Sequence, residues 1–178
     1  MDIENEVKKA QMGDRHAFVE LVRIVENDLY GMACSILRNE EDSADALQET
    51  ILKAYKSISN LREPEYFKTW MFRIIINESK KIAKKRSRSI TVSEFPTEAF
   101  KTNEYEKIEL HDAVERLDEP LRIIIILRYF YDLNIKEISN TLEISESLAK
   151  IRLYRARKIL LRLLQSSEGK ELRLHGRS

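Results

Sequence analysis

Apolar residues recur along most of the chain at the spacing of an α-helix. In the first half, Phe18, Leu21, Val22, Val25 and Leu29 fall on one face of a helical projection. The same period returns in the segments 44–55, 67–75, 108–117, 121–130, 134–142 and 145–164. Glycine and proline are scarce, with four and three residues, which also favours helix over sheet. The pattern therefore predicts an all-α protein.

Short polar breaks separate the predicted helices of the first half. Gly13 and Asp14 can end one helix and begin the next, because glycine tolerates a left-handed turn and an aspartate carboxylate accepts hydrogen bonds from free backbone N–H groups. Asn39 is expected to end the following helix. A new helix is then expected to start at Asp42 or Ser43.

Similar signals mark later helix ends. Pro64 suits the first turn of a helix, and residues 118–120 read as a stop followed by a new start. Asn134, with Glu137 three positions later, resembles a capping box in which Asn replaces the usual Ser or Thr. Ser145 is the expected cap of the last long helix.

Residues 87–103 lack this periodicity, are rich in Ser and Thr and include Pro96, which is typical of a linker.

Leu121–Phe130 is apolar enough to form a buried helix, and the last helix is expected to reach Leu164. The chain is accordingly predicted to consist of two small helical domains joined by a flexible linker. The predicted bounds are 1–88 for the first domain, 89–103 for the linker, 104–165 for the second domain and 166–178 for a frayed tail.

The chain is nearly neutral, so any argument for DNA binding depends on where its charges lie. Lys and Arg total 31 against 30 Asp and Glu, unlike the strongly basic proteins that coat nucleic acid. Cys34 is the single cysteine, which excludes an intramolecular disulfide, and three scattered histidines offer no zinc-ligand spacing. The N-terminus lacks the apolar core of a signal peptide, and the longest apolar run, 123–127, is too short to cross a bilayer. We expect a cytoplasmic protein without a cofactor or membrane insertion.

The last two predicted helices form the strongest functional pattern. Their apolar core positions are Ile138, Leu142, Ile144, Ala149, Leu153, Ala156 and Leu160. Their cations are Lys150, Arg152, Arg155, Arg157, Lys158 and Arg162. A helix that enters the major groove needs small or polar residues at its N-terminus and flanking cations for phosphates. The pattern favours a DNA-binding helix-turn-helix over the alternative, a surface helix with a solvated basic face.

The helix predicted from residue 44 has an acidic face. Its apolar stripe consists of Leu47, Ile51, Leu52 and Tyr55. Asp45, Gln48 and Glu49 fall at i, i+3 and i+4 on another face and could offer carboxylates and an amide to a basic partner. From the residues alone, a solvated acidic face is the better interpretation.

Aromatic residues stand close to cations between Tyr66 and Arg73, and a basic stretch continues to Arg88. A base removed from the duplex needs a stacking surface, and its phosphates need positive charge. This arrangement suits single-stranded DNA. The competing interpretation is ordinary core packing, which is favoured for Trp70 and Phe72 taken in isolation.

Taken together, these segments resemble the sigma-70 superfamily of transcription initiation factors, specifically its small extracytoplasmic-function (ECF) group, which retains only regions two and four. In region two the resemblance rests on DALQETILKAY at 45–55 and FKTWMFRIIINESKK at 67–81. In region four it rests on LDEPLRIIIILRYF at 117–130 and IKEISNTLEISESLAKIRLYRARKIL at 135–160. The resemblance as a whole covers most of the chain, from about Ala17 to Leu164.

The resemblance implies a division of labour among named residues and no catalytic site. Core RNA polymerase would be bound by Asp45, Gln48 and Glu49. The minus-ten element of promoter DNA would be captured and opened by Ser59, Asn60, Arg62, Tyr66, Phe67, Thr69, Trp70, Arg73, Asn77, Lys80, Lys81, Lys84 and Lys85. The minus-thirty-five element would be read by Ser147, Lys150, Ile151, Arg152 and Arg155. The family also suggests an anti-sigma factor that masks the free protein and a stress or envelope-response regulon.

The turn and recognition helix depart from the family pattern. Glu143 and Ser147 stand where glycine is common, and Leu148 and Ile151 where Thr and a small hydroxyl residue are frequent. The bases that are read therefore do not follow by analogy. One alternative is a helix-turn-helix regulator that binds an operator without polymerase. Another is an enzyme acting on nucleic acid, for which we find no nucleophile with a base and no phosphate-cradling loop, while His16, His111 and His175 lie far apart.

Overall fold

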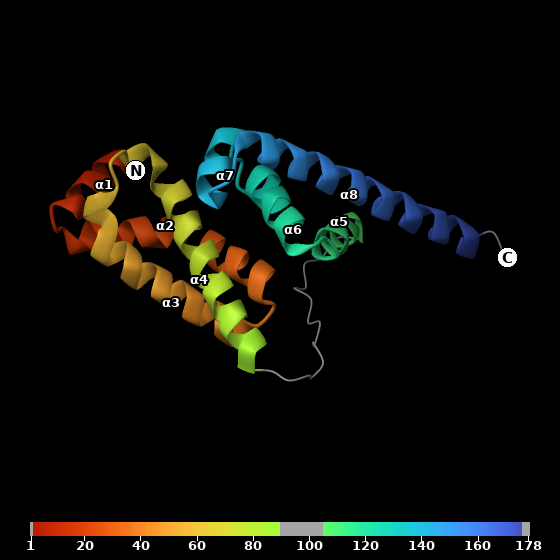
Figure 1. Cartoon of the computed structure of the whole chain (residues 1–178), viewed down its shortest axis with the longest axis horizontal. Helices are drawn as coiled ribbons and strands as arrows, with labels where there is room; N and C mark the ends of the chain where they lie inside the picture. The colour runs from red at the N-terminus through yellow and green to blue at the C-terminus, as the bar shows by residue number, and fades with distance from the viewer. Residues whose placement is uncertain (1, 90–104, 176–178) are drawn as a thin grey trace. The chain divides into compact units, whose positions relative to one another are not determined.

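The computed structural model describes residues 2–89 and 105–175, with side chains described for 2–87 and 110–165. Within these ranges the chain forms helices and short helical turns, with no strand (Figure 1). The helices gather into two compact units, the first around α1–α4 and the second around α5–α8. This confirms the all-α prediction with two helical domains. The predicted linker lies, from residue 90 onward, outside the described residues, and the predicted domain bounds stay predictions.

The break at Gly13 and Asp14 forms as predicted. Helix α1 (Ile3–Gln11) ends before Gly13, whose φ of +95° is the left-handed conformation that glycine tolerates. The Asp14 carboxylate then accepts hydrogen bonds from two backbone N–H groups in the first turn of α2 (Arg15–Leu37). A turn and a cap together allow an abrupt change of direction within a few residues.

Asn39 begins a helix instead of ending one. Arg38 takes the left-handed conformation after α2, with φ of 51°, and the Asn39 side chain accepts from the Asp42 N–H at 2.8 Å. Helix α3 (Glu40–Ser57) therefore starts directly at Glu40. The predicted start at Asp42 or Ser43 was too late, because the asparagine acts as the N-cap itself and leaves no room for a loop.

The segment between α3 and α4 is short and held in place. It contains two 3-10 turns, η1 (Ile58–Asn60) and η2 (Pro64–Tyr66), and Pro64 begins the second as predicted. The Gln11 side-chain amide donates to the backbone carbonyls of Ile58 at 3.0 Å and Leu61 at 2.6 Å. Helix α4 (Phe67–Ser89) follows at once. The loop is thus tied to α1 and gives α4 a defined starting point.

The core of the first unit lies among α2, α3 and α4, which pack against one another. Its largest fully buried side chains are Leu21, Leu29, Met32, Phe67, Met71, Phe72, Ile75 and Ile76. Cys34 is also buried, as expected for a small apolar residue. Phe72 is core, in agreement with the interpretation favoured for it in isolation.

The second unit begins with two short helices joined by a buried arginine. Helix α5 (Tyr105–Glu115) is followed by α6 (Glu119–Ile125), whose N-cap residue is Asp118. Arg122 is 5% exposed, and its guanidinium donates to the Leu117 carbonyl at 2.7 Å. It also reaches the carbonyl of Glu115 at 3.3 Å. The arginine thereby satisfies backbone acceptors that the end of α5 leaves open.

The apolar run Leu121–Phe130 is buried only in part. Residues 122–127 are buried, but the run continues as a π-helical turn, η3 (Ile126–Phe130), that leaves Tyr129 and Phe130 51% and 56% exposed. A π turn widens the helix by one residue and so rotates the following side chains away from the core. The prediction of one buried helix is confirmed for its first part and wrong for its end.

The predicted caps of the last two helices are confirmed. Asn134 and Glu137 form a capping box at the start of α7 (Ile135–Leu142). The Ser145 hydroxyl accepts from the Leu148 N–H at 3.2 Å at the start of α8 (Glu146–His175). The helical backbone of α8 continues past Leu164, where the sequence pattern predicted its end. Most residues after Leu164 are good helix formers, which explains the longer helix.

Candidate nucleic-acid and polymerase interfaces

Helix α3 buries small residues and exposes the acidic ones. Ala46, Thr50 and Ala54 are fully buried, whereas Leu52 and Tyr55 are 52% and 47% exposed. The predicted apolar stripe was therefore wrong for Leu52 and Tyr55. The reason is that small side chains let α3 approach its neighbours closely. Side-chain size as well as hydropathy therefore decides which residues of α3 are buried.

Asp45, Gln48 and Glu49 are all exposed on the outer face of α3, and we call these residues the α3 ridge. Leu52 follows them one turn later on the same side of the helix. The ridge thus combines carboxylates, an amide and an apolar side chain within a short rigid surface. Such a combination can bind a partner that has both cations and an apolar contact.

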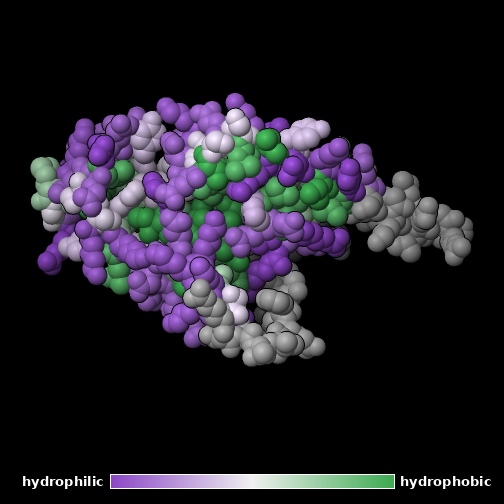
Figure 2. All heavy atoms as spheres, in the orientation of Figure 1, coloured by the Kyte–Doolittle hydropathy of each residue, from purple (hydrophilic) through white to green (hydrophobic). Residues whose placement is uncertain are grey.

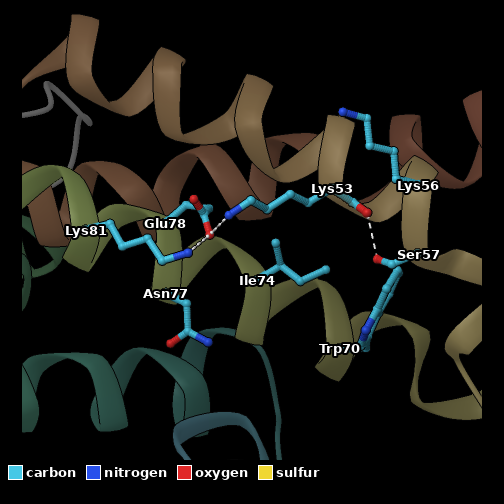
Figure 3. Close-up of a pocket in the computed structure, with 8 residues that line it drawn as sticks. All are labelled: Lys53, Lys56, Ser57, Trp70, Ile74, Asn77, Glu78 and Lys81. Carbon is cyan, nitrogen blue, oxygen red and sulfur yellow. Dashed lines mark hydrogen bonds and ion pairs between the residues drawn. The ribbon is translucent and has the colours of Figure 1, made fainter.

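A groove of about 610 Å³ lies between the end of α3 and the middle of α4. We call it the α3–α4 groove. It is lined by Lys53, Lys56, Ser57, Trp70, Ile74, Asn77, Glu78 and Lys81 (Figure 3). Trp70 stands beside Ser57 at one end, and Lys53 and Lys81 converge on Glu78 at the other. The groove therefore joins an aromatic face to a pair of cations.

At the cationic end of the α3–α4 groove, the carboxylate of Glu78 binds both lysines. Glu78 Oε1 accepts from Lys53 Nζ at 2.5 Å and from Lys81 Nζ at 2.9 Å, and the Glu78 side chain is only 10% exposed. Burial opposes ionisation of Glu78, but the hydrogen bonds and charges of both lysines outweigh it and lower its pKa. The hydrogen bond to Glu78 in turn raises the pKa of Lys81. Glu78 and Lys81 therefore remain charged at neutral pH.

The residues expected to meet the minus-ten element occupy different environments. Trp70, Asn77 and Lys81 line the groove. Tyr66 is half-buried, and the exposed members of the set are Ser59, Asn60, Arg62, Arg73, Lys80, Lys84 and Lys85. Phe67 and Thr69 are 1% and 8% exposed, so direct contact of these two with DNA does not fit the structure. The Phe67 ring lies 6.2 Å from that of Trp70, centroid to centroid, and can support it from the core.

Several residues that line the groove were not anticipated from the sequence, namely Lys53, Lys56, Ser57, Ile74 and Glu78. Lys53 and Glu78 belong to different helices, and only the packing of α3 on α4 brings them together. The one local signal was the spacing of Glu78 and Lys81, which is typical of an ion pair within a helix.

In the second unit, α8 follows α7 after a tight turn. Glu143 takes the left-handed conformation there with φ of 55°. Ala149, Leu153, Ala156 and Leu160 face the core. Of the residues expected to read the minus-thirty-five element, Arg152 is half-buried, whereas Ser147, Lys150, Ile151 and Arg155 are exposed. Arg157 differs from its neighbours because it donates to the Tyr129 hydroxyl and lies 5.5 Å from that ring.

This geometry defines the class of the protein. A short helix, a tight turn and a second helix with cations on its exposed face make a DNA-binding helix-turn-helix. In the part of the chain with described side chains, no group of three or more His, Cys, Asp or Glu residues could hold a metal ion. Among the same residues, none of the helices is both long and apolar enough to traverse a bilayer.

Comparison with known proteins agrees with this class. Residues 21–89 match the family model for sigma-70 region 2, and residues 107–160 match the model for sigma-70 region 4. The RNA polymerase sigma factor SigV of Bacillus subtilis (strain 168) is 34% identical over 137 residues, which cover 75% of this chain and 82% of that protein. The ECF RNA polymerase sigma factor SigW of the same organism is 26% identical over 184 residues, covering 93% and 98%.

The fold is also that of a solved sigma factor. The sigma factor RpoE of Bartonella quintana, crystallised with the anti-sigma factor NepR, matches with a TM-score of 0.71 at 21% identity over 83% of this chain and 96% of that one. The chain therefore belongs to the ECF group of the sigma-70 family of RNA polymerase sigma factors.

Proposed function

We propose that the chain binds core RNA polymerase through the α3 ridge and directs it to promoters that its two helical units read at separate elements. The observation that supports this most directly is the α3–α4 groove, which offers an aromatic face and fixed cations next to a face suited to a protein partner. On this proposal the protein acts by binding, with no chemistry of its own.

The α3 ridge is the proposed contact with polymerase. Asp45, Gln48 and Glu49 are exposed without forming part of the core, and α3 is anchored from the opposite face by Ala46, Thr50 and Ala54. A rigid helix loses little conformational entropy when its exposed face binds a partner. The ridge is therefore prepared for a basic surface on the polymerase.

The α3–α4 groove is the proposed site for an unpaired base of the minus-ten element. Trp70 can stack on the base, an interaction that contributes roughly 1–3 kcal/mol. Asn77 can form hydrogen bonds with the base edge, and Lys53 and Lys81 can attract the adjoining phosphates. Exposed Lys80, Lys84 and Lys85 would extend that attraction along the strand.

The exposed face of α8 is the proposed reader of the minus-thirty-five element. Its first turn contains Ser147, and Lys150 and Arg155 follow on the exposed surface. An N-terminal turn also places free backbone N–H groups where a phosphate can be bound. The helix thus combines phosphate attraction with side chains near the base edges.

We also propose an anti-sigma partner, a cytoplasmic location and a stress or envelope-response regulon. The chain is almost neutral, and part of its basic stretch is already engaged, since Arg86 forms an ion pair with Asp42 at 3.0 Å. Free protein should accordingly bind DNA weakly. A factor that depends on polymerase for its affinity can be controlled by a protein that covers the docking surface.

Run-off transcription from a genomic promoter library tests the proposal, with core polymerase in the presence and absence of the chain. Start sites that appear only with the chain are expected. The double variant Asp45→Ala, Gln48→Ala should lose binding to core polymerase, whereas Glu4→Ala, which removes an exposed acid from α1, should retain it. Equal promoter binding with and without polymerase, together with normal polymerase binding by the ridge variant, would favour an operator-binding regulator instead.

A further inference from the structure

Two apolar side chains stand among the cations in the first two turns of α8. Leu148 is 37% exposed and Ile151 is 47% exposed. They stand next to Lys150 and Arg152 and one turn before Arg155. In Figure 2 polar residues cover much of the visible face of the molecule, and apolar side chains are gathered into limited patches. An exposed leucine and isoleucine within a basic surface suit a partner that is anionic and also presents an apolar group.

The two side chains are neighbours on the helix. Leu148 and Ile151 lie three positions apart, which places them on one face and separates them by roughly 4.5 Å along the helix axis. Adjacent base pairs in DNA are about 3.4 Å apart. The pair can therefore contact base pairs that are adjacent or nearly so.

The orientation of this face is set by the core. Ala149 and Leu153 are buried on the inner side of α8, 0% and 5% exposed. Leu148 and Ile151 consequently point away from the helical core and outward with the cations. Ser147 precedes them in the first turn and is also exposed. The first two turns of the exposed face thus offer one hydroxyl and two branched apolar groups.

The charges around Leu148 and Ile151 indicate which kind of molecule this surface can bind. Lys150 and Arg155 are exposed, Arg152 is half-buried, and the one acid of the first turn, Glu146, precedes the apolar pair. Cations on both sides of an apolar pair suit a polyanion that presents an apolar group between its phosphates. In the major groove the 5-methyl group of thymine is the apolar group that the bases present.

We propose that Leu148 and Ile151 bind thymine methyl groups in the minus-thirty-five element and so make thymine a determinant of promoter choice. The inference rests on the proposed function and names the chemistry of one of its sites. Serine or threonine at these positions would favour hydrogen-bonded base edges. Leucine and isoleucine have no hydrogen-bonding group, so they favour thymine, whose methyl group they can cover and remove from water.

Replacing thymine by deoxyuridine tests the proposal, because uracil lacks only the methyl group. The probes are duplexes of a promoter recovered from the transcription library, with each thymine of the minus-thirty-five element replaced in turn on either strand. Binding of the holoenzyme, core polymerase with the full chain, is measured by competition. We expect about fourfold weaker binding for each contacted methyl, the factor that corresponds to ~0.8 kcal/mol for a buried methylene.

Variants test whether the weaker binding of uracil duplexes depends on Leu148 and Ile151. The double variant Leu148→Ala, Ile151→Ala should bind thymine and uracil duplexes equally. Leu161→Ala removes another exposed apolar side chain farther along α8, 58% exposed, and should keep the uracil effect. None of the three side chains belongs to the buried core, so the unfolding temperatures of both variants should stay close to that of the native protein.

The outcomes separate this inference from the proposed function. A minus-thirty-five element without thymine on either strand overturns the inference, as does a uracil duplex that binds normally at every position. Equal uracil sensitivity in the double variant overturns it as well. None of these results would remove the start sites that appear only with the chain. Failure of the proposed function would instead mean that no such start site is found.

Discussion

Replacing Glu78 by glutamine should destabilise the first helical unit and do so only above acidic pH. The carboxylate is 10% exposed and bonded to Lys53 and Lys81, whose side chains are 42% and 65% exposed. Hydrogen bonds to charged groups contribute roughly 1.5–3 kcal/mol when protected, and exposed ion pairs about 0–1 kcal/mol. Since solvent screens both ammonium groups and glutamine can still accept one bond, we expect a loss of about 1–2 kcal/mol.

The pH dependence follows from the lowered pKa of Glu78. A group whose pKa is lower in the folded state stabilises the fold above its unfolded pKa, ~4.3 for glutamate. That contribution disappears as pH falls through the folded value. The difference in stability between the native protein and Glu78→Gln should therefore be largest at neutral pH and shrink below about pH 4.

Urea unfolding followed by tryptophan fluorescence measures this difference in the intact chain. Trp70 is the single tryptophan and lies in the same groove as Glu78, so the signal reports on the first unit. A loss of this size should lower the urea midpoint by about 0.5–1 M. Glu63→Gln removes an exposed acid and should shift the midpoint far less. An equal midpoint for Glu78→Gln at pH 7, or a difference that grows on acidification, would refute the reasoning.

Three further changes address the groove, the core and the caps. Trp70→Ala should slow promoter opening by the holoenzyme about 5- to 150-fold, the equivalent of losing one stacked base; permanganate footprinting that detects normal opening would contradict this. Phe67→Ala should destabilise the first unit by about 3–5 kcal/mol because its ring is buried, and urea unfolding that shows a loss below 1 kcal/mol would disagree. Asn134→Ala should remove the capping box and cost about 1 kcal/mol, seen as faster hydrogen exchange in α7 but not in α3.

The helix ends that could be predicted are those with a local cause. Gly13 with Asp14, Asn134 with Glu137, and Ser145 each act on backbone groups within a few residues. Their effect does not depend on the rest of the fold. Asn39 shows the limit of such signals, because an asparagine after a left-handed residue can end one helix or cap the next, and the sequence alone does not distinguish the two.

Features that depend on packing between helices were predicted less well. Leu52 and Tyr55 were expected inside α3, but Ala46, Thr50 and Ala54 form its buried face. Burial there follows from how closely α3 approaches α2 and α4, which hydropathy does not encode. The pairing of Lys53 with Glu78 has the same origin. The ridge residues, by contrast, were identified correctly as exposed, since their spacing alone places them on one face.

Helix α3 connects the two proposed contacts of the first unit. Glu49 lies on the ridge, and Lys53, one turn later, turns toward α4 and meets Glu78. A helix is stiff over one turn, so a partner that binds the ridge also determines where Lys53 and the groove are presented. The ion pair between Lys53 and Glu78 then joins α3 to α4, the helix that carries Trp70. On the proposed function, docking to polymerase and capture of a base would be coordinated by this rigid arrangement without any conformational change in the unit.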